Sequence, residues 1–115
     1  MNNVIIGKVI IGDGYPTALM AELGTFYNQN IDKAISFIDN VVSSGCPILK
    51  TEILRDANIC LNKENFITTY NHYKGSKTEN YRKLIERKVV SLGNYKKIID
   101  YAHNKKMPFV ASVYD

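Results

Sequence analysis

Three apolar runs separated by helical segments constrain this chain more than any other feature of its sequence. Residues 17–24, 48–54 and 107–114 are rich in aliphatic and aromatic side chains, with a glycine or proline beside or within each run. Such near-continuous runs are typical of strands that are buried on both faces of a parallel sheet. Strands that alternate with helices form right-handed βαβ units. The sequence therefore predicts an α/β fold built on a three-stranded parallel sheet.

Two segments between these runs carry clear helix signals. Asn30 can cap a helix whose apolar residues recur at the spacing of one helix face, and Gly45 can end that helix in the left-handed conformation. Ser91 can cap a second helix, and Lys105 and Lys106 lie at the end that the helix dipole makes favourable for cations.

The remaining segments carry weaker signals. Residues 4–11 contain two short β-prone runs and predict a small hairpin within residues 1–16. Residues 55–78 are rich in Asn, Lys, Thr and Gly, and they predict a long loop with a short helical turn near residues 62–70. Apolar spacing predicts a further helix over residues 79–89.

The length of 115 residues limits the architecture. A closed eightfold α/β barrel needs about 250 residues. A three-stranded parallel sheet leaves two unpaired edges, which a finished domain rarely leaves open. We therefore expect one domain over residues 1–115, with the hairpin in 1–16 and three strands with their helices in 17–115, truncated from a larger α/β protein. Such a chain is expected to fold poorly or to associate when it is alone.

Composition favours a cytoplasmic protein. Hydrophobic residues make up 45% and charged residues 23% of the chain, as in ordinary globular proteins. No apolar run reaches the roughly 18–20 residues of a membrane span, and no basic segment begins a secretory signal. Cys46 and Cys60 lack the spacing of a disulfide framework or a metal motif, so we expect reduced thiols.

The positive charge is concentrated in the second half of the chain. Ten Lys and Arg stand against three acids between Lys74 and Lys106, which gives this segment a net charge of +7 and leaves −3 for the rest. Tyr70, Tyr73 and Tyr81 are interleaved with basic residues, a pattern that could stack single-stranded nucleic acid. The solvated face of helices explains the charges more simply, so nucleic acid is the less favoured partner.

Polar residues stand near the carboxyl ends of the predicted strands, where parallel α/β folds gather their ligands. Glu22 ends the first strand, Lys50 and Glu52 share one face of the second, and Ser112 and Asp115 end the third. A charge in a buried strand is costly unless it is paired or faces a polar cavity. Spacing alone leaves two interpretations open: a Glu22–Lys50 ion pair that only stabilises the core, or a functional site.

The order of these motifs resembles the N-terminal part of the sialic acid (N-acetylneuraminate) synthase family. Residues 6–16 and 19–24 resemble its opening hairpin and its I-A-E-I-G strand, and residues 30–45 resemble its first helix. Residues 48–52 resemble its V-K-F-Q strand, and residues 109–115 resemble its F-x-S-T-P-F-D strand.

The resemblance implies the first three βα units of a TIM (β/α)8 barrel. Members of this family are transferases of carbohydrate biosynthesis, which condense phosphoenolpyruvate with an N-acylated amino sugar to give a sialic or related nonulosonic acid. A divalent metal, Mn²⁺ or Mg²⁺, polarises the sugar aldehyde in these enzymes. The resemblance is also compatible with a homodimeric full-length protein.

The resemblance also implies roles for individual residues. Glu22 matches the catalytic glutamate beside the sugar and metal, and Lys50 matches the lysine that meets phosphoenolpyruvate. Glu52 stands where the family has a glutamine that contacts the sugar, and Ser112 stands where a threonine binds the phosphate. Residues 26–29 read Phe-Tyr-Asn-Gln in place of the family's N-H-x-G. The family's metal ligands belong to strands that this chain does not contain.

Three classes of function therefore stay open. The chain is part of a divergent synthase, a non-catalytic relative that binds a sugar or a phosphoenolpyruvate-like ligand, or, as the least favoured class, a basic module for nucleic acid or protein. Whether the chain belongs to an enzyme is not decided by the sequence. We expect the 115 residues alone to lack synthase activity, because they lack the metal site and five strands of the barrel.

Overall fold

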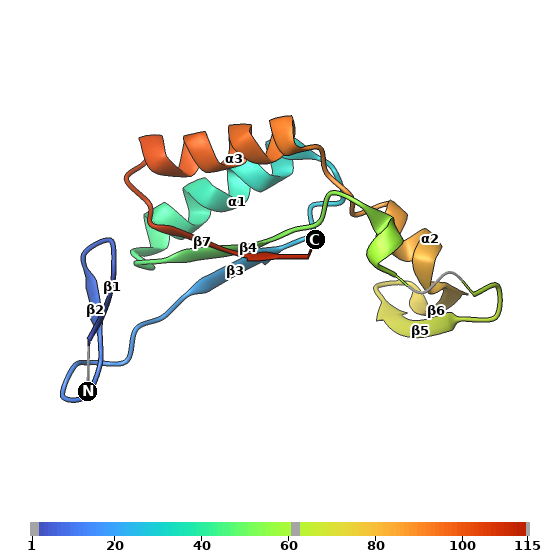
Figure 1. Cartoon of the computed structure of the whole chain (residues 1–115), viewed down its shortest axis with the longest axis horizontal. Coiled ribbons are helices and arrows are strands. Elements are labelled where there is room, and N and C mark those ends of the chain that lie inside the picture. The colour runs from blue at the N-terminus through green and yellow to red at the C-terminus, as the bar shows by residue number, and fades with distance from the viewer. Residues whose placement is uncertain (1–2, 61–62, 115) are drawn as a thin grey trace.

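A three-stranded parallel sheet forms the centre of the molecule. The computed structural model describes residues 3–60 and 63–114. Its central strands are β3 (Ala21–Gly24), β4 (Leu49–Ile53) and β7 (Phe109–Val113), in the order β3-β4-β7 (Figure 1). The predicted α/β fold with three parallel strands is confirmed. The first strand is shorter than predicted, because residues 17–20 form no strand.

Both long helices cover the same face of this sheet. Helix α1 (Ile31–Ser44) and helix α3 (Leu92–Asn104) lie side by side above it in Figure 1. The predicted caps are confirmed, since the side chains of Asn30 and Ser91 accept hydrogen bonds from the backbone N–H groups three residues further on. Gly45 ends α1 with a φ of 75°, a conformation that glycine adopts without steric cost.

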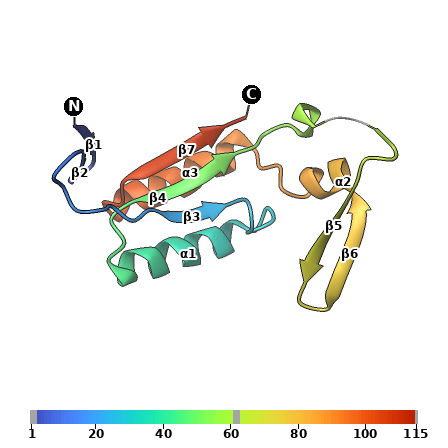
Figure 2. The same ribbon diagram turned by 90° about the horizontal axis from the view of Figure 1, so that it is seen from below.

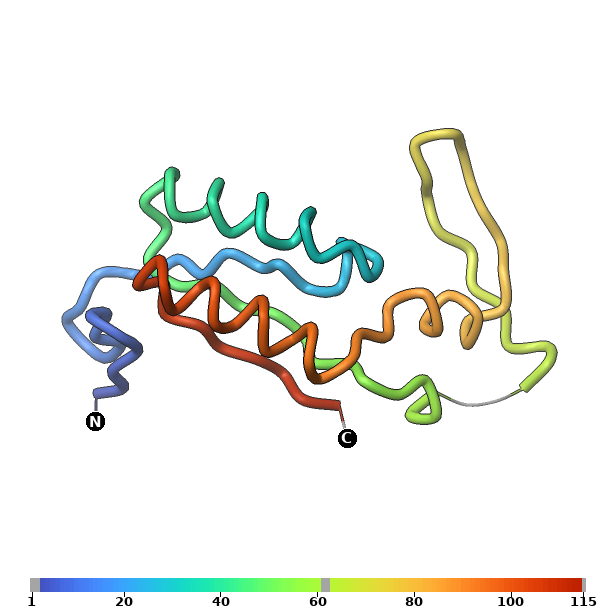
Figure 3. Tube along the Cα trace, turned by 90° about the horizontal axis from the view of Figure 1, so that it is seen from above, coloured from blue at the N-terminus to red at the C-terminus, as the bar shows by residue number. Residues whose placement is uncertain are grey.

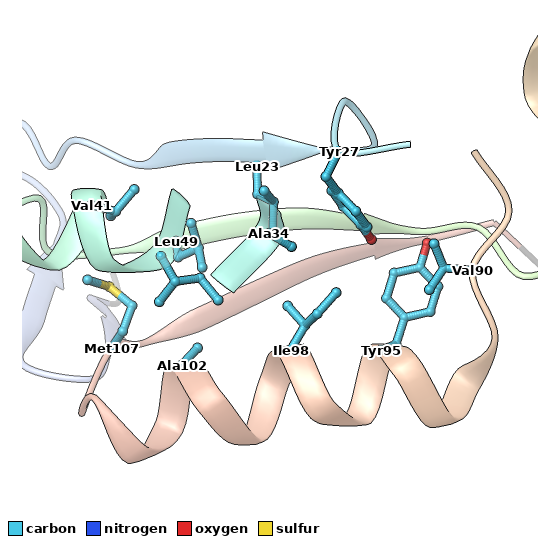
Figure 4. Close-up of a cluster of buried hydrophobic side chains, with 11 residues drawn as sticks. Leu23, Tyr27, Ala34, Val41, Leu49, Val90, Tyr95, Ile98, Ala102 and Met107 are labelled. Carbon is cyan, nitrogen blue, oxygen red and sulfur yellow. The ribbon is translucent and has the colours of Figure 1, made fainter. Parts of the chain in front are cut away.

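The hydrophobic core fills the space between the sheet and the two helices (Figure 4). Leu23 and Leu49 reach it from the strands, and Ile38 and Ile98 reach it from the helices, each with at most 1% of its surface exposed. Because side chains alternate along a strand, the neighbours of Leu23 and Leu49 point to the opposite face of the sheet. Among the described residues, no helix covers that face (Figures 1 and 2), and we call it the open face.

The predicted N-terminal hairpin is confirmed. Strands β1 (Val4–Ile6) and β2 (Val9–Ile11) pair antiparallel around a turn at Gly7. Gly7 has a φ of 60°, and a Cβ atom there would come within 2.4 Å of the Pro108 side chain. The turn therefore requires glycine both for its backbone conformation and for its close approach to the start of β7.

The segment between β4 and α3 differs from the prediction. Residues 55–78 were predicted as a loop, but they contain a 3₁₀ turn, η1 (Ala57–Ile59), strand β5 (Ile67–His72) and the first part of β6 (Gly75–Asn80). The helical turn expected near 62–70 is wrong from residue 67 onward, where β5 begins, and residue 62 lies outside the described residues. Two features of the sequence favour this hairpin: Thr and Tyr favour strands, and Gly75, which has a positive φ, suits a tight turn. The polar composition of the segment favours a loop, and the loop prediction followed the composition.

The predicted helix over 79–89 is shorter in the structure. Helix α2 covers only Tyr81–Glu86, because Glu79 and Asn80 complete β6. The Asn80 side chain accepts a hydrogen bond from the backbone N–H of Lys83 and so caps α2. The β5–β6 hairpin and α2 extend away from the sheet (Figures 2 and 3). The radius of gyration is accordingly 16.6 Å, against about 13 Å for a compact domain of this length.

Glu79 attaches the β5–β6 hairpin to the end of α2. Its Oε1 atom accepts a hydrogen bond from the Tyr70 hydroxyl at 2.6 Å and another from the Arg87 guanidinium at 2.6 Å. These two donors, with the charge of Arg87, lower the pKa of Glu79 to about 2. One carboxylate thus joins the two strands of the hairpin through Tyr70 and ties the hairpin to the end of α2 through Arg87.

Acidification should therefore weaken the contact between the hairpin and the end of α2. A carboxylate whose pKa is lower in the folded state stabilises the fold above its unfolded pKa, and this contribution is lost as the pH falls through the folded value. For Glu79 the window runs from pH 4.5 down to about 2. NMR shifts of the Tyr70 ring should change across this window and should stay constant in Glu79→Gln. Equal shift changes in both proteins would contradict the role of Glu79.

Candidate functional site

The four candidate residues meet on the open face of the sheet. Glu22 pairs in register with Lys50, and Glu52 pairs in register with Ser112. Alternation along β4 places Lys50 and Glu52 on the face opposite to Leu49 and the helices. Three neighbouring parallel strands thus bring two carboxylates, one ammonium group and one hydroxyl together on one surface.

Glu22 and Lys50 form the ion pair that the sequence suggested. Lys50 Nζ lies 2.5 Å from Glu22 Oε2, and the carboxylate raises the pKa of Lys50 by accepting this hydrogen bond. The Lys50 side chain is 27% exposed and the Glu22 side chain 49% exposed, so the pair is not buried. Exposed ion pairs add little to stability. The exposure of this pair therefore argues against the interpretation that it only stabilises the core.

Glu22 also has a local structural role. Its Oε1 atom accepts a hydrogen bond from the Gly24 backbone N–H at 2.8 Å. The pairing of β3 with β4 is irregular between Glu22 and Gly24, and Gly24 has a φ of 53°. Both carboxylate oxygens are therefore engaged, one with this irregular turn of β3 and the other with Lys50.

Glu52 has a partner that the sequence analysis missed. The Tyr114 hydroxyl donates a hydrogen bond to Glu52 Oε1 at 3.1 Å, and the carboxylate raises the pKa of Tyr114. Strand alternation from Ser112 places Tyr114 on the same face, and this signal was present in the sequence. Asp115, the other residue proposed at this strand end, lies outside the described residues.

Ser112 lies opposite Glu52 on the outer strand β7. It is partly buried, and its hydroxyl has no hydrogen-bond partner among residues 3–60 and 63–114. A free hydroxyl can donate one hydrogen bond and accept others. Ser112 is therefore available to a ligand on the open face.

The connection between β3 and α1 has a strained and unusual structure. Asn28 and Gln29 adopt φ values of 48° and 67°, which residues other than glycine rarely adopt. The Gln29 amide donates to the carbonyls of Glu86 and Val89, and Lys88 Nζ donates to Asn28 Oδ1 at 3.1 Å. The segment that departs from the family's N-H-x-G thus fixes the end of α2 beside the carboxyl edge of the sheet.

The described residues do not suit a bound metal ion. Within residues 3–60 and 63–114, no group of three His, Cys, Asp or Glu side chains comes close enough to hold one. Glu22, the residue expected beside the metal, has both oxygens engaged by Lys50 and Gly24. We therefore derive no step through a metal from this chain.

The basic segment gives little support to stacking of nucleic acid. The Tyr70 hydroxyl is bonded to Glu79, and Tyr81 packs edge-on against Phe66 with ring centroids 5.3 Å apart. Tyr73, which is 84% exposed, lies at the tip of the hairpin. Two of the three tyrosines that could stack bases are thus engaged within the protein.

In the part of the chain that the structure describes, we find no helix that is both long and apolar enough for a bilayer.

Comparisons with known proteins find similarity in structure and not in sequence. No family model matches the chain, and no curated protein matches it significantly. The N-acetylneuraminic acid (sialic acid) synthetase of Leptospira borgpetersenii serovar Hardjo-bovis superimposes with a TM-score of 0.76 over 99% of this chain, at 14% identity. The spore coat polysaccharide biosynthesis protein SpsE of Bacillus subtilis superimposes with a TM-score of 0.65 over 99%, at 17% identity.

These matches cover only part of the larger proteins. The chain spans 35% of the Leptospira chain and 28% of the Bacillus chain. The resemblance to sialic acid synthases suggested by the sequence is therefore confirmed at the level of the fold, for a partial and divergent chain.

Proposed function

We propose that this chain is a sialic acid synthase-like protein of carbohydrate biosynthesis, and that its open sheet face binds phosphoenolpyruvate and an N-acylated amino sugar. In this proposal the three parallel strands are the first strands of a TIM barrel. The observation that supports it most strongly is the convergence of Glu22, Lys50, Glu52 and Ser112 on the open face. The fold shared with a sialic acid synthetase and with SpsE supports it independently.

Lys50 and Ser112 supply the groups that an anionic substrate needs. The Lys50 ammonium has three N–H donors, and the ion pair with Glu22 occupies one of them. A phosphate or carboxylate of phosphoenolpyruvate could therefore take a second N–H while the pair stays intact. The Ser112 hydroxyl, on the neighbouring strand, would donate a further hydrogen bond to the anion.

Glu52 and Glu22 supply acceptors for the hydroxyl groups of a sugar. Glu52 is fixed by Tyr114 and accepts hydrogen bonds only, so it suits a donor on the ligand. Glu22 holds Lys50 in place and lies where the reacting aldehyde would be expected. A divalent metal, which the resemblance implies, would need ligands from outside the described residues.

A non-catalytic binding protein is the second candidate. The strained connection at Asn28 and Gln29 replaces a motif that the family uses in its site, and its side chains are engaged with α2 and its C-terminal end. Binding of both ligands without turnover would be the property of such a protein.

Two measurements on the 115-residue chain test the proposal. We expect phosphoenolpyruvate to bind to the chain. Inorganic phosphate should displace it, and an oligothymidylate should leave its affinity unchanged. We also expect no phosphate release from phosphoenolpyruvate plus an N-acylmannosamine with Mn²⁺ or Mg²⁺. Tight binding of the oligonucleotide with no binding of phosphoenolpyruvate would contradict the proposed site, and phosphate release by the pure chain would contradict the expected lack of activity.

A further inference from the structure

The two outer strands of the parallel sheet differ in how their free edges are protected. Strand β3 has only four residues, carries the charge of Glu22, and pairs irregularly with β4 between Glu22 and Gly24. The Gly24 N–H is already bonded to the Glu22 carboxylate. Short strands, charged side chains and irregular pairing are the features by which natural sheets keep their edges from pairing with other chains. The β3 edge is therefore protected.

Strand β7 has none of these protective features. Its residues, Phe109–Val113, include no charged side chain and no proline, and they pair with β4 without a register shift. It is the outermost strand in Figure 2, and no strand of the described residues pairs with its outer side. Val113 on this strand is 61% exposed. An uncharged and regular edge strand is a template for pairing with another chain.

Alternate residues of β7 direct their backbone groups toward this free edge. At one end of the strand the Pro108 carbonyl accepts a hydrogen bond from the Leu49 N–H, and at the other end the Tyr114 N–H donates to the Ile53 carbonyl. A parallel ladder repeats every two residues, so the even-numbered residues of β7 bond to β4. The odd-numbered residues direct one N–H and one C=O each away from the sheet; these are Phe109, Ala111 and Val113.

We propose that β7 pairs antiparallel with β7 of a second copy of this chain, about a two-fold axis at Ala111. In this register Ala111 lies opposite Ala111 of the second copy, and Phe109 lies opposite Val113 of the second copy. Every outward N–H of one copy then meets an outward C=O of the other. The two sheets become one continuous sheet, with the helices of both copies on the same face.

The side chains of β7 suit pairing with an identical strand. A two-fold axis brings like residues together, and like charges opposite each other would be destabilising, but β7 carries none. The residue at the axis is alanine, which is small enough to lie beside its own copy. Phe109 opposite Val113 makes a favourable aromatic and β-branched pair, and it covers the exposed Val113 side chain.

The open face stays accessible in this dimer. Antiparallel neighbours point their side chains to the same face, so Ser112 lies opposite Val110 of the second copy and keeps its hydroxyl toward the open face. The inference therefore goes beyond the proposed function and does not depend on which ligand the open face binds.

Sedimentation equilibrium of the 115-residue chain over a range of concentrations tests this dimer. We expect a reversible equilibrium that ends at the dimer, because a two-fold contact is closed and the β3 edge is protected. Val113→Lys places a charge in the contact and should raise the dissociation constant by about tenfold or more. Ile67→Lys, at a 62% exposed position on β5, is the matched control and should leave the dissociation constant unchanged.

Val113→Pro tests the backbone hydrogen bonds. The Val113 N–H points to the free edge, so proline removes a bond of the dimer and none of the bonds to β4. This variant should also weaken the dimer, while the far-UV circular dichroism of the dilute monomer should match that of the unchanged chain.

Amide hydrogen exchange locates the contact. The amides of Phe109, Ala111 and Val113 should become protected as the concentration rises, whereas those of Val110 and Ser112 should be protected at every concentration. A chain that stays monomeric at all concentrations would overturn the proposal and leave this edge to a strand of another kind. A dimer in which the three odd-numbered amides exchange freely and Val113→Lys has no effect would place the contact elsewhere and overturn it equally.

Discussion

Ile98→Ala should lower the free energy of unfolding by about 2–5 kcal/mol. Ile98 lies on α3 with none of its surface exposed, between the sheet and α1. Its truncation removes apolar contacts and leaves a cavity that neighbouring side chains fill only in part.

Urea denaturation followed by circular dichroism measures this effect. Leu92→Ala is the matched control, because Leu92 belongs to the same helix but is 56% exposed. This control should change the free energy of unfolding by less than about 0.5 kcal/mol. Equal losses in the free energy of unfolding for Ile98→Ala and Leu92→Ala would contradict the packing of Ile98 between α3 and the sheet.

Lys50→Met should weaken the binding of phosphoenolpyruvate by about tenfold or more. Methionine keeps most of the side-chain bulk but removes the charge-assisted hydrogen bond to the substrate. The ion pair with Glu22 is exposed, so its loss should hardly alter the midpoint of urea denaturation.

Lys74→Met is the matched control for Lys50→Met. Lys74 lies in the turn between β5 and β6, far from the open face, and its replacement removes the same charge (Figure 3). It should leave the affinity for phosphoenolpyruvate unchanged. A loss of stability in Lys50→Met with unchanged affinity would mean that the ion pair is structural.

The sequence predicted those parts of the fold that local signals determine. The caps at Asn30 and Ser91 and the left-handed Gly45 lie where the helices begin and end, because each residue acts on the backbone beside it. Residues 17–20 are apolar but form no strand, because a strand also requires a partner at the matching register, which sequence composition does not show.

The β5–β6 hairpin shows a second limit. Both faces of its strands carry mostly polar residues. The strands therefore lack the alternation of apolar and polar residues by which a half-buried strand is recognised. Contacts between residues far apart in the sequence, such as Gln29 with Glu86 and Val89, hold this region in place. These contacts depend on the tertiary structure and carry no local signal.

The candidate site was predictable in part. The period of two along β4 places Lys50 and Glu52 on one face, and the parallel order of the strands brings Glu22 and Ser112 beside them. The cavity lined by Glu52, Tyr114, Ile59 and Ile85 was not predictable, because one of its walls comes from η1 and α2, and contacts such as those of Gln29 with Glu86 and Val89, which carry no local signal, place the end of α2.

The most direct test of this account is a titration of the isotope-labelled chain with phosphoenolpyruvate, followed by NMR. We expect saturable shift changes at Glu22, Lys50 and Ser112. In Lys50→Met the changes at Glu22 and Ser112 should need about tenfold more ligand or more, and in Lys74→Met all three should be unchanged. Shift changes confined to the basic hairpin around Lys74, or unchanged by Lys50→Met, would contradict a substrate site on the open face of the sheet.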